Sequence, residues 1–276
     1  MKALKEALIR HLQGFDSLLV AFSGGVDSTF LLAMASQVLG DRAVAVTCTS
    51  IIYPQRELEE AAVFTREHRI EHLHFVFPIT SLPEFIANGP ERCYHCKRLL
   101  FRSLKEIAEK RGIRHIAHAA NLDDLEDYRP GGKAAQEMGI LAPLVDCGFR
   151  KADIRRLSRE MGLACWDRPA MACFASRIPY GDAITETKLR MVEQAEQFLY
   201  SQGFSHFRVR HHGPVARIEV AGSDLKRMLE PGIRQKTVEA LRNAGFHHIA
   251  LDLEGYVTGS LNRALDRKDR SDGRQE

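Results

Sequence analysis

Residues 17–35 read SLLVAFSGGVDSTFLLAMA, and this stretch decides the fold. Its first six residues are mostly apolar and rich in β-forming types, which predicts a buried strand. A glycine turn follows at residues 23–28, and a helix is expected from there to about residue 39. Glycines let the backbone approach a phosphate closely, while hydroxyls and the N–H groups of a helix N-terminus supply donors. The stretch therefore predicts a nucleotide-phosphate loop between a strand and a helix.

Four small residues of this turn are the candidate ATP ligands: Ser23, Gly24, Gly25 and Ser28. Phosphate alone would repel Asp27, so a bridging Mg²⁺ is its expected partner. The turn is not a Walker A loop, because no Lys-Ser/Thr pair ends it, and it lacks the spacing of the dinucleotide fingerprint. An ordinary capped strand–helix turn is the alternative, and the full string favours a nucleotide.

Outward from the turn, the first half of the chain alternates strand and helix signals. Short apolar runs predict further strands at 43–49, 72–77 and 114–119. Short apolar strands separated by helices are typical of a parallel sheet covered on both faces. The expected fold class is therefore α/β, with a parallel-sheet domain over residues 1–183.

The pattern changes after Pro143. A helix, a loop rich in small residues and a long helix precede three strand candidates, at 207–211, 216–220 and 248–253. These segments predict a smaller C-terminal α+β domain over residues 184–265. The tail 266–276 has no apolar residue and is expected to be disordered.

The composition is that of a globular enzyme, with 276 residues, 45% hydrophobic and 27% charged. No apolar stretch approaches the roughly 20 residues of a membrane-spanning helix. The N-terminal residues have helical periodicity rather than the apolar core of a signal peptide, which predicts a cytoplasmic protein. The formal charge is only +3, from 39 basic and 36 acidic residues, so it does not demand a nucleic-acid partner and does not forbid one; a small-molecule partner is expected.

Two of the six cysteines, Cys93 and Cys96, form a CxxC pair in GPERCYHCKRLLF. Without a signal peptide, metal or redox roles outrank structural disulfides. The pair is compatible with half a zinc site, a redox disulfide or part of an iron–sulfur site. The chain has no second CxxC, which weakens the zinc interpretation.

Cys173 lies in RPAMACFASRIPYG, among small residues and between Arg168 and Arg177. Nearby cations lower the pKa of a thiol and favour the nucleophilic thiolate, so Cys173 is the candidate catalytic cysteine. Together with Cys93 and Cys96 it could hold a [4Fe-4S] cluster and leave one iron open to exogenous sulfide. The alternative is that Cys173 only packs a loop.

Two further motifs supply candidate ligands. Asp124, in NLDDLEDYRPG, follows the predicted fourth strand at the sheet edge where open α/β sheets bind ligands, which makes it a second ATP contact. Arg208 and Arg210 alternate on a strand in FRVRHH and point to one face, as a phosphate clamp requires, and Arg177 could complete the clamp. A solvated acidic loop and a solvated strand face are the respective alternatives.

The string SGGVDS resembles the signature of PP-loop ATP pyrophosphatases, which have the adenine nucleotide alpha hydrolase-like fold. These enzymes cleave ATP between the α and β phosphates and form adenylates. The resemblance implies that the glycine turn cradles pyrophosphate and that Asp27 holds Mg²⁺. GMP synthetases, NAD synthetases and tRNA thiolases share the motif equally.

Six motifs together resemble the LarE family, over about residues 12–262: SGGVDS, RCYHCK, NLDDLEDYRPG, CFASRIPYG, HHGPVARIEV and LDLEGYVTGS. This family consists of ATP-dependent sulfur transferases of nickel-pincer cofactor synthesis. They adenylate the carboxylates of pyridinium-3,5-biscarboxylic acid mononucleotide and convert them to thiocarboxylates. Some members sacrifice one cysteine, and others bind a cluster through three.

The CxxC pair together with Cys173 makes this chain similar to the cluster-binding members, and sacrificial donation from Cys173 stays open. The resemblance also implies a homo-oligomer, a hexamer built from trimers, and it does not identify the sulfur donor. Three other functions remain as alternatives: a tRNA thiolase, an amide-forming synthetase that accepts ammonia and has no need of the CxxC pair, and a non-catalytic nucleotide-binding module.

Overall fold

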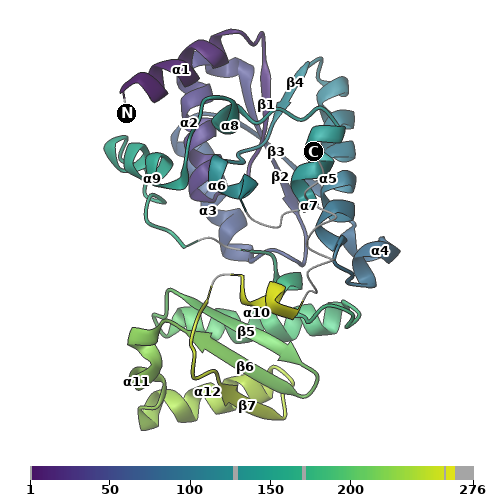
Figure 1. Cartoon of the computed structure of the whole chain (residues 1–276), viewed down its shortest axis with the longest axis vertical. Helices are drawn as coiled ribbons and strands as arrows, with labels where there is room; N and C mark the ends of the chain where they lie inside the picture. The colour runs from purple at the N-terminus through teal and green to yellow at the C-terminus, as the bar shows by residue number, and fades with distance from the viewer. Residues whose placement is uncertain (1, 127–129, 170–171, 258, 265–276) are drawn as a thin grey trace. The chain divides into compact units, whose positions relative to one another are not determined.

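A parallel sheet organises the first half of the chain in the computed structural model, which describes residues 2–126, 130–169, 172–257 and 259–264. The sheet has four strands in the order β3-β2-β1-β4 (Figure 1). The strands are β1 (Leu18–Ala21), β2 (Ala43–Thr49), β3 (Glu71–Val76) and β4 (His115–Ala117). Leu18 pairs with Ala43 on one side and with His115 on the other, so the strand order reverses at β1. Ligands of open α/β sheets bind at such a reversal, beyond the carboxyl ends of the strands.

The helices of this unit connect the strands in sequence. They are α1 (Lys2–Gln13), α2 (Val26–Leu39), α3 (Gln55–Glu67), α5 (Arg92–Lys110), α7 (Pro130–Glu137) and α9 (Lys151–Glu160), with the short helices α6 (Leu122–Leu125) and α8 (Pro143–Asp146). Helices α1 and α9 pack against α2, and α7 packs against α5. The predicted α/β fold with a parallel sheet is therefore confirmed.

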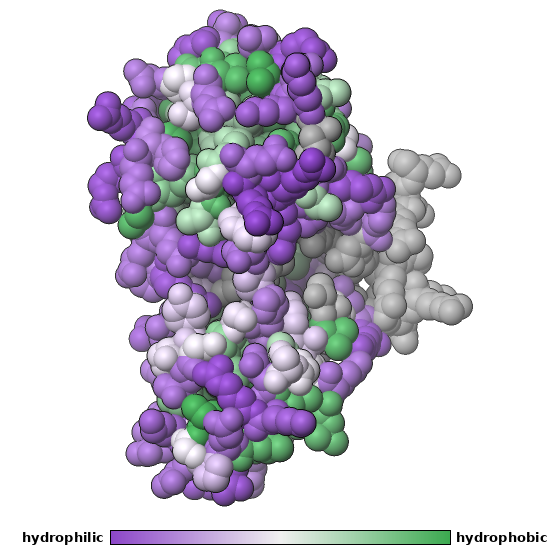
Figure 2. All heavy atoms as spheres, turned by 90° about the vertical axis from the view of Figure 1, so that its left-hand side faces the viewer, coloured by the Kyte–Doolittle hydropathy of each residue, from purple (hydrophilic) through white to green (hydrophobic). Residues whose placement is uncertain are grey.

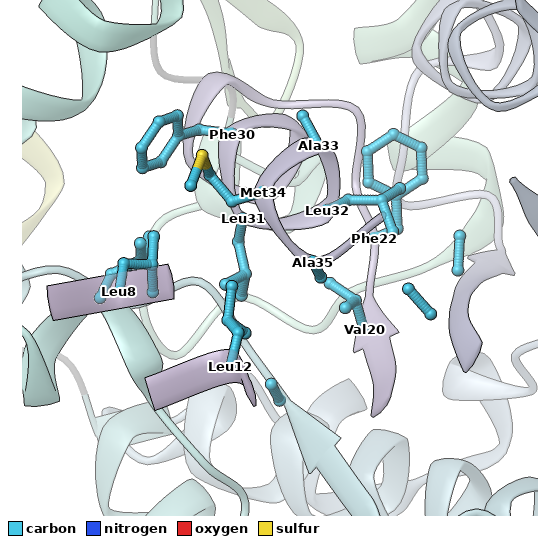
Figure 3. Packing of buried hydrophobic residues seen from close by; sticks show 14 of the residues in the cluster. Leu8, Leu12, Val20, Phe22, Phe30, Leu31, Leu32, Ala33, Met34 and Ala35 are labelled. Atoms are coloured by element: carbon cyan, nitrogen blue, oxygen red, sulfur yellow. The ribbon is translucent and has the colours of Figure 1, made fainter. Parts of the chain in front are cut away.

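Helix α2 is apolar on nearly all sides because it is enclosed on nearly all sides. Figure 3 shows its side chains directed toward Leu8 and Leu12 of α1 and toward Val20 of β1. Phe30 and Met34 are fully buried within the same cluster. Burying such side chains stabilises the fold by about 1.5–3 kcal/mol each. This packing fixes the start of α2, and with it the glycine turn that precedes the helix.

The second unit contains a three-stranded sheet in the order β5-β6-β7. Strands β5 (Phe207–His212) and β6 (Val215–Val220) form an antiparallel hairpin, and β7 (His248–Leu251) runs parallel to β6. The hairpin turns at Gly213, whose φ of 57° suits glycine. Helices α10 (Glu186–Ser201) and α12 (Pro231–Asn243) pack with this sheet around Leu199, Val209 and Leu241. Short helices α4 (Pro83–Ile86) and α11 (Leu225–Met228) complete the unit.

By their contacts, the described residues divide into one unit of 2–79 and 91–169 and another of 80–90 and 172–264. The domain limits 1–183 and 184–265 expected from the sequence stay a prediction. The tail 266–276 lies outside the described residues. None of the helices within the described ranges is both long enough and apolar enough to cross a bilayer. Hydrophilic residues dominate the face in Figure 2, because most of the hydrophobic residues lie in the two cores.

Candidate functional site

The glycine turn lies directly beyond the carboxyl end of β1. Gly24 has a φ of +74°, and Gly25 caps α2, which begins at Val26, two residues earlier than predicted. The Ser28 hydroxyl donates to the Gly25 carbonyl over 3.1 Å and lies 3.0 Å from the Ser23 hydroxyl. The Ser23 amide in turn donates to the Ser28 Oγ over 3.3 Å. The structure thus brings the four predicted ATP ligands into one turn; their contact with ATP stays a prediction.

Gly24 is also where α3 approaches the turn most closely. A Cβ atom added there would lie 3.3 Å from both the Ala61 Cβ and the Glu57 carbonyl oxygen. Gly24→Ala is therefore expected to destabilise the protein by about 1–3 kcal/mol, from the positive φ and the crowding together, and to weaken ATP binding. Chemical denaturation and ATP titration measure both effects.

Gly112→Ala is the matched control for that substitution. Gly112 has a similar φ of +65°, but nothing lies within 4 Å of an added Cβ. It should show the stability cost of the backbone conformation alone and leave ATP affinity unchanged. Equal ATP affinity in the Gly24 and Gly112 variants would contradict the interpretation that α3 supports the turn.

Asp27 is half-buried in the first turn of α2 and carries an ion pair that sequence reasoning missed. The Lys151 Nζ donates to its Oδ2 over 2.5 Å. Lys151 is the first residue of α9, where the helix dipole disfavours a cation. That unfavourable position was the available signal that the lysine is kept for another purpose. The pair places a positive charge beside the glycine turn, where it can balance phosphate or the Asp27 carboxylate.

The acidic segment after β4 contacts Lys151 of this ion pair through Asp123. Asp124, which the sequence predicted as an ATP contact, makes a different hydrogen bond. Asp124 caps α6, with its Oδ2 accepting from the Asn121 amide over 3.1 Å. Asp123 accepts instead from the Lys151 amide at 2.7 Å and from the Arg150 Nη1 at 2.6 Å. The hydrogen bond from the Lys151 amide, followed by Arg150, lowers the pKa of Asp123. Asp124 as an ATP ligand stays a prediction.

The CxxC pair occupies the first turns of α5. Cys93 and Cys96 lie three residues apart and thus on one helix face, partly exposed. Helix α7 packs over this turn, because a Cβ on Gly131 would lie 2.9 Å from the Lys97 Cγ and 3.5 Å from the Cys93 carbonyl oxygen. All six cysteines are thiols rather than disulfides. The redox-disulfide interpretation of the pair stays a prediction, because a redox pair is a dithiol in its reduced state.

Cys173 belongs to the second unit, where its backbone is held firmly. It precedes the 3₁₀ turn Phe174–Arg177, and its carbonyl accepts from the Ser176 amide at 3.0 Å and the Ser176 hydroxyl at 2.9 Å. The Arg177 Nη1 donates to the same carbonyl over 3.1 Å. Arg168, the other predicted cationic neighbour, belongs to the first unit and pairs with Glu60 over 2.5 Å. Activation of Cys173 by Arg168 stays a prediction.

Arg177 is completely buried and forms a two-pronged ion pair with Glu196 of α10, at 2.8 and 2.9 Å. Its Nη1 also donates to the Ala172 carbonyl over 2.6 Å and to the Ser176 hydroxyl over 2.8 Å. Burial lowers the pKa of Arg177, but Glu196 and, to a smaller extent, Cys173 raise it above its ordinary value. Arg177 therefore stays charged and fastens the Cys173 loop to α10.

Breaking this ion pair should be costly. Glu196→Gln leaves the Arg177 charge buried without a counter-charge, so the free energy of unfolding should fall by about 3–5 kcal/mol. Urea unfolding of the purified protein measures the loss. The double variant Arg177→Met with Glu196→Leu removes both charges and should recover most of that stability. Equal losses in the single and double variants would contradict this account of the pair.

Arg208 and Arg210 lie on β5 and are both buried. Arg210 pairs with Glu219 at 2.9 and 2.8 Å and donates to the Ser176 carbonyl over 2.8 Å. Arg208 donates to the Tyr256 hydroxyl over 3.4 Å, with its guanidinium 4.9 Å from the centre of that ring. Burial, and then the charge of Arg177, lower the pKa of Arg208 to about 10. A nearby anion would relieve both effects.

Arg177, Arg208 and Arg210 together form a cationic cluster of the second unit. Glu196 pairs with Arg177, and Glu219 pairs with Arg210. Arg217 is balanced by Asp252, at 3.1 Å. Binding of a substrate phosphate by this cationic cluster stays a prediction. Among the described residues, no group of three or more His, Cys, Asp or Glu is arranged to hold a metal ion.

The chain is similar in sequence to one family of known proteins and to several individual relatives. The asparagine synthase family matches residues 1–103. An uncharacterised protein of Synechocystis is 38% identical over 266 residues, covering 95% of this chain and 99% of that protein. The pyridinium-3,5-bisthiocarboxylic acid mononucleotide synthase of Lactiplantibacillus plantarum is 33% identical over 264 residues, covering 95% of each. A glutamine-hydrolysing GMP synthase component of Thermoplasma acidophilum is 27% identical over 160 residues, covering 52% of this chain and 51% of its own.

Proposed function

Since the chain belongs to the LarE family of ATP-dependent sulfur transferases, we propose that it converts pyridinium-3,5-biscarboxylic acid mononucleotide into the bisthiocarboxylate used for the nickel-pincer cofactor. The observation that carries the proposal is the match, over 95% of both chains, to a relative named for that product. The glycine turn beyond β1 suits the adenylation step, and Cys173, alone or together with Cys93 and Cys96, suits the sulfur transfer.

The first step is adenylation. A substrate carboxylate oxygen attacks the α-phosphorus of ATP, the bond to the bridging oxygen breaks, and pyrophosphate leaves. Ser23, Gly24, Gly25 and Ser28 would orient the phosphates, with Asp124 as a second contact. Asp27 would hold Mg²⁺, since a half-buried carboxylate at this position is the donor type that Mg²⁺ prefers. Positioning and charge neutralisation carry such phosphoryl chemistry.

Lys151 gives this step a second cation. Its Nζ lies 2.5 Å from the Asp27 Oδ2, and the Lys151 amide is fixed by Asp123. Because both the backbone and the ammonium group of Lys151 are held, its positive charge is preorganised. It can therefore stabilise the developing negative charge on pyrophosphate without reorganisation. The lysine would thereby take the part that a Walker lysine plays in P-loop enzymes, which the glycine turn itself lacks.

The second step exchanges oxygen for sulfur. A sulfur nucleophile attacks the acyl carbon of the adenylate, the bond from carbon to the AMP oxygen breaks, and a thiocarboxylate forms. Three thiols, Cys93, Cys96 and Cys173, fit the donor set of a [4Fe-4S] cluster with one open iron. Such a cluster, when bound, would supply a sulfide at that iron. Arg177 and Glu196 keep the Cys173 backbone in place for either route.

The alternative source of sulfur is Cys173 itself. Its thiolate would attack the adenylate, release AMP and form a thioester. Removal of the Cys173 α-proton and cleavage of the Cβ–S bond would then give the thiocarboxylate and leave dehydroalanine. This route needs neither Cys93 nor Cys96, which distinguishes it from the cluster route.

The substrate carries a phosphate of its own, and the cationic cluster of the second unit is the proposed site for it. Arg208 and Arg210 would face that phosphate from one strand face, although Arg210 also donates to Glu219 and to the Ser176 carbonyl. Arg177 would contribute charge rather than hydrogen bonds, because its N–H groups are used by Glu196 and the Cys173 loop. A homo-oligomer and a cytoplasmic location are implied by the resemblance and the sequence, and no particular sulfur donor is indicated.

A product assay tests the proposal. Anaerobically purified protein is incubated with Mg²⁺, ATP, sulfide and the biscarboxylate mononucleotide, and products are identified by mass spectrometry. The proposal predicts one sulfur-for-oxygen exchange at each carboxylate, with one AMP released per exchange. A parallel reaction with bulk tRNA tests the thiolase alternative. Thiolated tRNA together with an unchanged mononucleotide would overturn the assignment.

A further inference from the structure

We infer that His72 is a positioning residue for the glycine turn, because it closes a ring of contacts between the turn and the helix behind it. The inference concerns ATP binding and does not depend on which substrate accepts the sulfur. His72 lies on β3, the edge strand of the first sheet, and its side chain bonds to Thr47 and Thr65 rather than to the predicted ATP ligands. It would therefore act through its neighbours.

One arm of the ring leads from His72 to the backbone before the turn. The His72 Nε2 lies 2.7 Å from the hydroxyl of Thr47, a buried residue of β2. That hydroxyl donates to the Phe22 carbonyl over 2.7 Å. Phe22 immediately precedes Ser23, and its ring also meets the His72 ring edge-on at 5.6 Å. The Phe22 carbonyl, and hence the entry to the turn, is held in place through Thr47.

The other arm leads from His72 to the helix behind the turn. The His72 Nδ1 lies 2.9 Å from the hydroxyl of Thr65, a buried residue of α3. One turn earlier on that helix is Ala61, whose carbonyl lies 3.1 Å from the same hydroxyl. Ala61 is also the residue that a Cβ on Gly24 would touch. The ring of contacts is thus closed from Gly24 through α3, His72 and β2 back to Phe22.

The hydrogen bonds of this ring have a defined direction. Thr47 has one hydroxyl proton, and it is given to the Phe22 carbonyl, so His72 must donate to Thr47 from Nε2. With its proton on Nε2, the neutral imidazole has an unprotonated Nδ1, which can accept the single Thr65 hydroxyl proton in place of the carbonyls of Ala61 and Ala62. Burial and the neighbouring His74 lower the pKa of His72 to about 4, so the ring is neutral near pH 7. One tautomer therefore serves both arms.

The physical consequence is a fixed distance between α3 and β1. A methyl group on Gly24 would already lie within 3.3 Å of α3, closer than ordinary van der Waals contact. Any shift of the helix would either press on the turn or widen the phosphate cradle. His72 bonds to both sides, through the hydroxyls of Thr47 and Thr65, so it sets this spacing.

Direct ATP titration of the full-length protein tests the inference. His72→Ala removes both hydrogen bonds and should weaken ATP binding about tenfold. Thr47→Val removes the link to Phe22 alone and should weaken it in the same direction. His72→Gln restores an N–H near the position of Nε2 and should recover most of the affinity. The Michaelis constant for the mononucleotide should not change, because the cationic cluster proposed to bind its phosphate belongs to the second unit.

His74→Ala is the matched control. His74 is exposed on the same strand, and its imidazole lies 4.0 Å from that of His72, but it does not take part in the hydrogen bonds to Thr47 and Thr65. It should bind ATP like the wild type. Unchanged ATP affinity in both the His72→Ala and Thr47→Val proteins would overturn the inference. So would equal losses in His72→Ala and His72→Gln, because a general packing effect would then explain them. If His72→Ala does not fold, Thr47→Val and His72→Gln decide the question alone.

Discussion

Asp27→Ala is expected to reduce substrate-dependent pyrophosphate release by about a thousandfold. The carboxylate is the proposed Mg²⁺ ligand, and its Oδ2 also orients Lys151 at 2.5 Å. Its removal would therefore leave the pyrophosphate without its metal and with a misplaced cation. A coupled pyrophosphate assay under saturating ATP measures the effect, and ATP binding without Mg²⁺ should change much less.

Asp41→Ala is a suitable control for that variant, because Asp41 is an exposed carboxylate in the short turn that follows α2. It should release pyrophosphate at the wild-type rate. Asp27→Asn keeps the shape of the side chain and should be nearly as inactive as alanine, because the charge binds the metal. Pyrophosphate release that survives in Asp27→Ala would remove this residue from the adenylation step.

Cys173→Ala is expected to abolish thiocarboxylate formation while leaving pyrophosphate release largely intact. Cys173 carries the only thiol of its loop, whereas the glycine turn belongs to the other unit of the chain. Adenylation and sulfur transfer should therefore separate in this variant. Quenched reactions analysed for adenylate, AMP and thiocarboxylate would show the adenylate being made and then hydrolysed without sulfur.

Two other cysteine variants make that result specific. Cys147→Ala is the control, because burial raises the pKa of this thiol and disfavours its nucleophilic form. It should keep full activity. Cys93→Ala separates the two sulfur routes: it should be inactive if three thiolates hold a cluster and active if Cys173 is sacrificed. Thiocarboxylate formed by the Cys173→Ala protein would contradict both routes.

The fold was readable from the sequence because its signals are local. The run 17–35 fixes β1, the glycine turn and α2 through apolar patterning and two glycines, and β2 was predicted at its observed limits. The second sheet was predicted with its three strands for the same reason. Boundaries were less accurate: β4 covers only His115–Ala117 of the predicted 114–119, because pairing with β1 ends there.

The site was only partly readable because its interactions join distant segments. Lys151 pairs with Asp27 across more than a hundred residues, so its unusual position at a helix N-terminus does not identify its partner. Asp123 and Asp124 are adjacent in sequence, so only the structure shows which of them fixes Lys151. The Glu196 partner of Arg177 likewise lies on the apolar side of an amphipathic helix, where a buried acid is uncommon. An acidic residue at an apolar position of a helix is the one sequence signal for this ion pair. It does not identify Arg177 as the partner until the fold is known.

The central claim is that a carboxylate is activated by adenylation and then loses its oxygen to AMP. Substrate carrying heavy oxygen in its carboxylates tests this most directly, with mass analysis of the AMP from a single turnover. The account predicts one heavy oxygen in each AMP and one sulfur in the matching carboxylate. AMP without the label, alongside a thiocarboxylate product, would show that sulfur enters without an adenylate and would contradict the account.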